Sequence, residues 1–181
     1  MKMRVRLAAP DEAPTLWEIR NQAIRHGCRE SYEAEVLRAW TPEMMPEGYR
    51  HAVRDNPFYV VEEEGGRTAA TGYLDLRGGS VEAIFTRPEC FGKGYAGLIV
   101  TAIIAEARRR GLTRITLEAT PNAAGFYLRH GFVALGEKWL PSKLANAGFT
   151  LRGYGAGAEL SPKRRRCATV KAAFQFASLR N

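Results

Sequence analysis

Two stretches of this chain decide its fold: Gly92-Lys93-Gly94-Tyr95-Ala96-Gly97 and Asn122-Ala123-Ala124-Gly125-Phe126-Tyr127-Leu128-Arg129-His130-Gly131-Phe132. The first opens a helical pattern, and a glycine loop at a helix start presents main-chain N–H groups that suit phosphates. The second places Tyr127 inside a short predicted helix after a strand, where its phenol is suited to donate a proton. A phosphate site beside a proton donor predicts group transfer from a phosphorylated carrier.

Outward from these stretches, apolar residues follow either helical or strand spacing. Helices are predicted over residues 11–26, 33–40, 46–54 and 94–110. Asn122 is expected to cap a further short helix that Gly131 ends. Strands are predicted near residues 5–7, 58–62, 69–76, 81–86, 115–118, 132–139 and 168–177. This order predicts an α+β fold, a three-layer α/β arrangement in which helices flank a mixed, mostly antiparallel sheet.

The composition is that of an ordinary globular protein, since 45% of the 181 residues are hydrophobic and 25% are charged. We expect one domain over residues 1–181. Its segment 140–181 is atypical, first glycine-rich and then basic, and is expected to carry the last strand. No apolar run reaches the roughly 18 residues of a membrane span, and the N-terminal residues do not resemble a signal peptide, so a cytoplasmic protein without a membrane partner is expected.

The three cysteines, Cys28, Cys90 and Cys167, are isolated in the sequence. They lack the spacing of metal ligands, and their odd number disfavours a disulfide framework, so neither a metal site nor disulfides are expected. Cys90 lies beside the glycine loop, where a reactive thiol is conceivable. An ordinary packed cysteine is the expected outcome.

The formal net charge of +8 favours an anionic partner, such as a polyphosphate cofactor, an acidic membrane surface or nucleic acid. Part of it lies in the run Lys163-Arg164-Arg165-Arg166. Basic residues without a recognised motif give only unspecific, salt-sensitive binding to nucleic acid. A nucleic-acid-binding protein is therefore an alternative and not the expected function. A homodimer is compatible with the sequence.

The glycine loop also satisfies the G-x-G-x-x-G pattern of dinucleotide-binding proteins, and Glu118 follows Gly97 at a distance typical of their ribose-binding acid. Such a loop follows its strand directly, whereas here the residues 87–91 intervene. Only 63 residues follow Glu118, which is too few for the further βα units of that fold. A dinucleotide site is therefore disfavoured.

The stretch from Ile84 to Ile99 resembles the acetyl-CoA signature of the GNAT family of N-acetyltransferases, [Gln/Arg]-x-x-Gly-x-[Gly/Ala], in which Gly94 and Ala96 occupy the last two fixed positions. The stretch 122–132 resembles the second motif of that family, an Asn at a helix start followed by Phe-Tyr and Gly-Phe. The resemblance covers about residues 3–139. It departs from the family at Phe91, where a Gln or Arg is usual.

The resemblance implies a GNAT-like acyl-CoA N-acyltransferase fold with acetyl-CoA as co-substrate. The main chain of the strand at Ile84, Phe85 and Thr86 would contact the pantetheine arm and the acetyl carbonyl, and Asn122 would hydrogen-bond the pantetheine. The implied cofactor-binding residues are Ile84, Phe85, Thr86, Phe91, Gly92, Lys93, Gly94, Tyr95, Ala96, Gly97, Asn122 and Tyr127. Lys93 either adds charge to the phosphates or is a solvated lysine.

The reaction implied is direct attack of a primary amine on the thioester in a ternary complex. Tyr127 is the candidate general acid, because a phenol with a pKa of about 10 is protonated at neutral pH and can protonate the leaving thiolate. Glu82 is the candidate general base and Glu118 is its alternative, each acting directly or through water. His130 is interpreted as a residue of the helix end and not as a base.

The acceptor is expected to be a small-molecule or peptide amine, bound between the stretch Trp17–Trp40 and the region after Trp139. Charged residues of the first stretch, namely Arg20, Arg25, Arg29 and Glu30, are expected on solvated faces and do not identify the substrate. A GNAT-like protein that binds CoA without catalysis is a further alternative.

Overall fold

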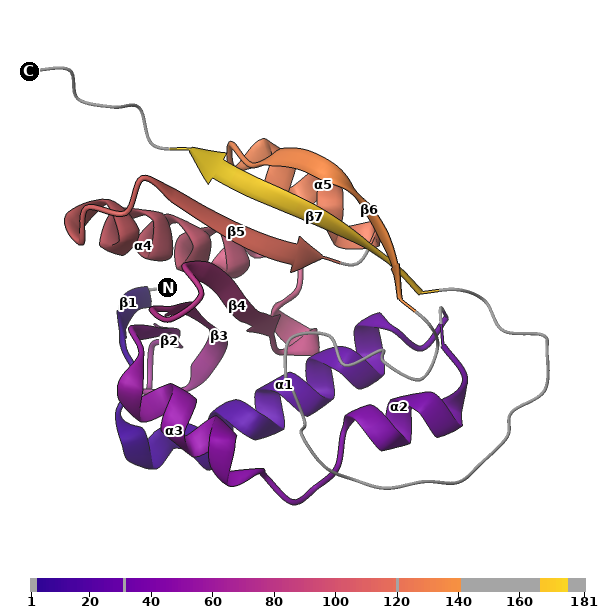
Figure 1. The fold of residues 1–181 in the computed structure, drawn as a ribbon. Coiled ribbons are helices and arrows are strands. Elements are labelled where there is room, and N and C mark those ends of the chain that lie inside the picture. Colours follow the sequence, from indigo (N-terminus) through magenta and orange to yellow (C-terminus); the bar gives the residue numbers. More distant parts are fainter. Residues whose placement is uncertain (1–2, 31, 120, 141–166, 176–181) are drawn as a thin grey trace, which may run out of the picture. The chain divides into compact units, whose positions relative to one another are not determined.

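The computed structural model describes residues 3–30, 32–119, 121–140 and 167–175. The chain divides into two compact units, of which the first reaches Ile115 and the second runs from Thr116 to Gln175 (Figure 1). Each unit is described by itself. No helix in the described part of the chain is both long enough and apolar enough to cross a membrane.

The first unit contains an antiparallel sheet in which four strands pair in the order of the sequence. Strand β3 is almost entirely buried because its small residues, including Ala69, Ala70 and Gly72, are covered on both faces. The turn between the second and third strands uses Gly65 and Gly66 at positive φ. The strands are β1 (Met3–Leu7), β2 (Phe58–Glu63), β3 (Thr68–Asp75) and β4 (Ser80–Thr86).

Helices cover both faces of this sheet. One face packs against α1 and α3 through neighbouring rings of Trp17, Tyr49, Phe58 and Tyr73, whose centroids are 4.6–5.9 Å apart. The other face packs against α4, which lies across the sheet from α1 (Figure 1). The helices are α1 (Ala13–Gly27), α2 (Ala34–Trp40), α3 (Glu47–Asp55) and α4 (Tyr95–Arg109), with 3-10 turns at Pro10–Glu12 and Pro88–Cys90.

Strand β4 contains a bulge beside the predicted site. Thr71 pairs with Phe85 and Tyr73 pairs with Glu82, so two steps along β3 oppose three steps along β4. Ala83, at a φ of +54°, lies within the longer segment. Because directly paired residues share a face of the sheet, the bulge places both Glu82 and Phe85 on the α1 face.

The second unit contains β5 (Arg114–Ala119), whose first residues belong to the first unit, followed by α5 (Pro121–Arg129), β6 (Val133–Leu140) and β7 (Cys167–Gln175). Strand β7 lies between β5 and β6 and is antiparallel to β6, in a register that runs from Val133↔Ala173 to Leu140↔Cys167. Helix α5 packs against β7.

The predicted helices and strands are confirmed to within a few residues, including the last strand. Gly111 and Gly131 end α4 and α5 at φ values of +73° and +87°, as expected of glycines after a helix. The position of Asn122 was wrong: α5 begins at Pro121, so Asn122 lies in its first turn. Proline is favoured at the first helical position because its missing N–H needs no acceptor there. The glycines at 148–157 and the basic run 163–166 lie outside the described residues. The single-domain organisation stays a prediction.

Gly72 allows strand β3 to approach helix α4 closely. A Cβ atom on Gly72 would overlap Cδ1 of the half-buried Ile84 and lie 2.8 Å from Cγ2 of Ile99, which is fully buried. We therefore predict that Gly72→Ala lowers the free energy of unfolding by about 1–3 kcal/mol, the usual cost of overpacking. Urea denaturation measures it.

Gly48 offers a matched control, because it lies in α3 and a Cβ atom added there would meet no atom within 4 Å in the part of the chain that the structure describes. Gly48→Ala should leave stability unchanged or raise it by about 0.5–1 kcal/mol, since alanine favours a helix. Equal urea midpoints for Gly72→Ala and the wild-type chain would contradict the packing argument.

Candidate active site

The glycine loop links the 3-10 turn Pro88–Cys90 to α4. Gly92 and Gly94 adopt φ values of +77° and +82°, and Gly94 is the residue that caps α4. A Cβ atom at either position would lie more than 4 Å from the atoms of other described residues. The glycines are therefore required by the backbone conformation, and they leave the space beside the loop open to a ligand.

The start of α4 is suited to bind an anion. The first N–H groups of a helix have no acceptor within it, and in the described part of the chain the N–H groups of Gly94, Ala96 and Gly97 donate to no other residue. The next N–H, that of Leu98, already bonds to the Gly94 carbonyl at 3.3 Å. Together with the helix dipole, these N–H donors fit a phosphate or pyrophosphate.

A carboxylate lies inside the protein against the loop. Glu63, at the end of β2, is only 6% exposed and accepts hydrogen bonds from the Tyr95 hydroxyl at 2.8 Å and from the Arg67 guanidinium at 2.6 Å. The Lys93 ammonium lies 3.3 Å away. The bond from Arg67, followed by that from Tyr95, lowers the pKa of Glu63 to about 2, so this group is ionised at neutral pH.

This arrangement bears on two residues singled out from the sequence. The ammonium of Lys93 is directed to Glu63, an ion pair that neither sequence interpretation of Lys93 included. Its contact with phosphates stays a prediction. Cys90 is buried, as expected of a packed cysteine, and its thiol lies 3.8 Å from the Glu63 carboxylate. Burial raises the pKa of this thiol, which opposes reactivity.

Phe91, the residue that departs from the family signature, is 44% exposed and makes an edge contact with the ring of His26, at 5.3 Å between centroids. His26 lies in the last turn of α1, so the departure creates an aromatic contact between the loop and that helix. The sequence contained no signal that paired these residues, because they are far apart along the chain.

On β4, the candidate base Glu82 accepts a hydrogen bond from the Ser80 hydroxyl at 2.7 Å. It lies opposite Tyr73 on the α1 face. Burial, with a smaller contribution from Glu82, raises the pKa of Tyr73. Phe85 shares this face, where the Arg20 guanidinium lies 6.0 Å from its ring. The bulge therefore brings Glu82 and Phe85 to the side of the sheet that α1 covers.

The expectation that Arg20 lies on a solvated face was wrong. Arg20 is 7% exposed, its guanidinium lies 4.5 Å from the Trp17 ring, and it donates to the Trp40 carbonyl at 2.9 Å. Burial lowers its pKa to about 10. The long side chain is buried because it joins α1 to the end of α2, a contact between residues twenty apart that periodicity does not reveal.

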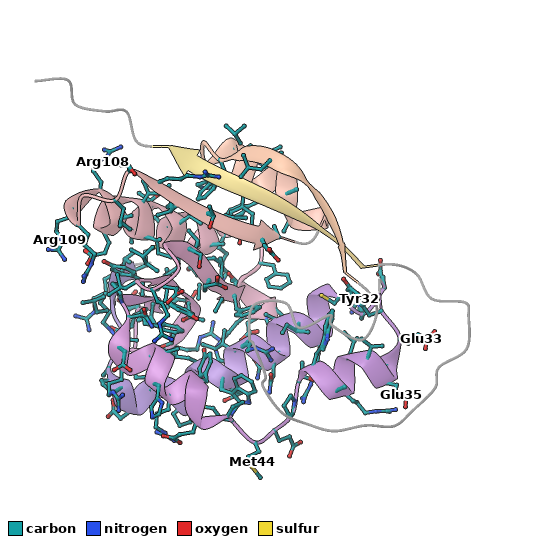
Figure 2. The ribbon with its side chains drawn as sticks, viewed as in Figure 1. Tyr32, Glu33, Glu35, Met44, Arg108 and Arg109 are labelled. Atoms are coloured by element: carbon teal, nitrogen blue, oxygen red, sulfur yellow. The ribbon has the colours of Figure 1, made fainter. Side chains whose placement is uncertain are left out.

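The remaining charged residues of this stretch are closer to expectation. Arg25, Arg29 and Glu30 are all exposed, as expected, and Arg25 also bonds to the hydroxyl and carbonyl of Thr41 at 2.8 and 2.7 Å. Figure 2 shows Glu33 and Glu35 pointing outward at the start of α2. The region that the resemblance assigns to the acceptor thus has acidic residues at the start of α2 and a buried arginine bonded to its end.

The other predicted site residues belong to the second unit. Tyr127 is half-buried in α5, and its ring makes edge contacts with Phe126 and Phe132 at 5.0 and 5.9 Å. His130 contacts the Phe126 carbonyl through Nδ1 at 2.9 Å, so its interpretation as a helix-end residue is confirmed. Glu118 is exposed on β5. The juxtaposition of these residues with the glycine loop stays a prediction, since the loop belongs to the first unit.

An α+β chain whose bulged strand leads through a glycine loop to an open helix start defines an acyl-CoA-type transferase fold. The chain belongs to the acetyltransferase (GNAT) family, which matches residues 21–132. The family and the fold class expected from the sequence are thereby confirmed.

Similar proteins include glucosamine 6-phosphate N-acetyltransferase 1 of Oryza sativa subsp. japonica, 30% identical over 109 residues. The match covers 55% of this chain and 63% of that relative, so the chain spans less than two thirds of the relative's length. Among solved structures, a GCN5-related N-acetyltransferase from Rhodopseudomonas palustris has a TM-score of 0.73 at 17% identity, covering 97% of both chains. The putative acetyltransferase YncA from Salmonella typhimurium, solved with its cofactor acetyl-CoA, has a TM-score of 0.67 at 19% identity, covering 100% of this chain and 98% of its own.

Proposed function

We propose that this protein is an acetyl-CoA-dependent N-acetyltransferase that moves an acetyl group to a primary amine in a ternary complex. The observation that carries the proposal is the start of α4, where N–H groups without an acceptor in the described part of the chain adjoin glycines with open space beside them. This main chain suits the pyrophosphate of a coenzyme A thioester. Family membership and the acetyl-CoA complex of the YncA protein support the same assignment.

In this proposal the cofactor is bound mainly by backbone. The N–H groups of Gly94, Ala96 and Gly97 hold the pyrophosphate, and the main chain of residues 84–86 contacts the pantetheine arm and polarises the acetyl carbonyl, as in an oxyanion hole. The bulge in β4 supports this role, because it alters the strand between Glu82 and Phe85, where this segment begins. Phe91 makes no polar side-chain contribution, and Asn122 bonds to the pantetheine.

The proposed chemistry moves two protons. Tyr127 protonates the departing thiolate of CoA, and Glu82 accepts the proton of the attacking ammonium directly or through water. Glu118 stays the alternative base. The hydrogen bond from Ser80 to Glu82 supports a defined orientation of that carboxylate. Main-chain donors stabilise the negative charge that develops on the acetyl oxygen between these steps.

The acceptor is a small-molecule or peptide amine. The rice relative is named for glucosamine 6-phosphate, so that amino sugar is the first acceptor to include in a screen with thiol detection. The proposed compartment is the cytosol, and the buried Cys90, a thiol outside any disulfide, agrees with reducing surroundings. A GNAT-like protein without catalysis would bind acetyl-CoA but release no thiol with any amine.

We predict that acetyl-CoA, but not NAD, raises the melting temperature. At about 100 times the dissociation constant, a ligand stabilises the folded state by about 2.7 kcal/mol, which corresponds to roughly 5–10 °C for a chain of this size. Differential scanning fluorimetry measures the shift. Gly94→Val is the control, because a β-branched residue is strained at a φ of +82° and should remove it. Stabilisation by NAD alone would refute the proposal.

We predict that Tyr127→Phe lowers turnover by about a hundredfold or more, the usual contribution of a general acid, while the dissociation constant of acetyl-CoA changes by less than about twofold. Steady-state kinetics with thiol detection and calorimetry separate the two quantities. Tyr59→Phe, which removes a phenol in β2 outside the site, should retain turnover. Wild-type turnover in Tyr127→Phe would remove Tyr127 from the mechanism.

We predict that Glu82→Gln lowers turnover and removes the loss of activity at low pH that protonation of a base produces, whereas Glu118→Gln keeps both at wild-type values. The pH profile of kcat/KM measures both variants. The reverse result would assign the base to Glu118. If both variants keep the wild-type profile, neither carboxylate is the base.

A further inference from the structure

Glu63 ends β2 at a hydrogen-bonded turn. Its N–H donates to the Arg67 carbonyl at 2.9 Å, and its own carbonyl accepts from the Gly66 N–H at 3.0 Å. The hairpin between β2 and β3 therefore fixes the backbone from which this side chain extends. The carboxylate is buried against the glycine loop, which is thirty residues later in the sequence.

The two oxygens of Glu63 have different partners. Oε2 accepts hydrogen bonds from Nε and Nη2 of Arg67, at 3.1 and 2.6 Å. These two bonds hold the carboxylate in one orientation. Oε1 accepts hydrogen bonds from three side chains in and beside the loop: the Tyr95 hydroxyl at 2.8 Å, the Lys93 ammonium at 3.3 Å and the Cys90 thiol at 3.8 Å. One oxygen atom thus contacts three side chains of the segment 90–95.

Lys93 and Tyr95 are the two neighbours of Gly94, the residue whose positive φ begins α4. Both neighbours are bonded to the same oxygen, so the peptide planes around Gly94 are held from inside the protein. A loop that is ordered before its ligand arrives loses less conformational freedom on binding. Gly92 and Gly94 increase the benefit of this constraint, because glycine has the largest conformational freedom to lose when a loop becomes ordered.

The charges around Glu63 allow its effect on the loop to be told apart from a direct electrostatic effect on the phosphates. A carboxylate close to a phosphate site repels the ligand, and Arg67 and Lys93 only balance it, since Arg67 also pairs with Glu89 at 2.9 Å. If charge alone mattered, removing the Glu63 charge would strengthen binding of acetyl-CoA. If the carboxylate holds the loop, removing it would weaken binding.

We propose that Glu63 is a positioning residue for the phosphate-binding loop, acting through Tyr95 and Lys93 on the main chain around Gly94. The inference rests on the proposed use of acetyl-CoA. Glu63 affects only how the phosphate end of acetyl-CoA is bound. Its removal should therefore change the KM for acetyl-CoA and not kcat.

The test compares Glu63→Gln, Tyr95→Phe and the double variant in steady-state kinetics. We expect each single variant to raise the KM for acetyl-CoA about tenfold with kcat unchanged, and the double variant to be little worse, since the two groups share one contact. Turnover of S-acetylpantetheine, a thioester without phosphate, should stay at the wild-type value. Glu62→Gln is the control, because this neighbour in β2 pairs with Arg4 and Arg6.

Two kinds of failure are distinguishable. A wild-type chain that neither binds acetyl-CoA nor transfers its acetyl group overturns the proposed function. An active wild-type chain whose Tyr95→Phe and Glu63→Gln variants keep the wild-type KM, bind acetyl-CoA more tightly, or lose activity equally with both thioesters overturns the role of Glu63. Tyr95→Phe removes a single hydroxyl, so it decides the question even where Glu63→Gln does not fold.

Discussion

The close packing of α4 on β3 and β4 at Gly72 is the constraint on which the first unit depends. Because position 72 has no side chain, Ile84 and Ile99 both occupy the space that a Cβ atom would need. The missing side chain allows α4 to lie close to the sheet. The helix start and the strand that should hold the thioester are therefore placed relative to each other by packing in the core. The sequence of the glycine loop then determines which N–H groups at the start of α4 are available to a ligand.

Neighbouring residues were sufficient to predict those features of the fold that depend only on local conformation. Helix ends at Gly111 and Gly131 followed from glycine's access to positive φ, and the strands of the β2–β3 hairpin followed from β-forming residues around a glycine turn. The glycine loop was recognised for the same reason, since its residues are contiguous. The family followed once two such local motifs were found at the right spacing.

Other features depend on contacts between residues far apart along the chain. Burial of Arg20 depends on the end of α2, the Phe91–His26 contact depends on how α1 packs, and the Glu63 cluster joins β2 to the loop. A charged residue next to an apolar one has the same sequence pattern whether it is buried or solvated. The bulge at Ala83 is likewise a matter of register between two strands, which composition does not encode.

The Glu63 cluster, in which Glu63 binds Arg67, Cys90, Lys93 and Tyr95, shows that the glycine-loop motif depends on a residue outside its own segment. Residues 88–110 contain the whole glycine pattern, yet the acceptor for Tyr95 and Lys93 belongs to the preceding hairpin. Grafted alone onto another scaffold, this segment would bring a phenol and an ammonium without the carboxylate that orients them. The smallest portable unit is therefore the β2–β3 hairpin together with the loop and α4, a structural module assembled from two separate parts of the chain.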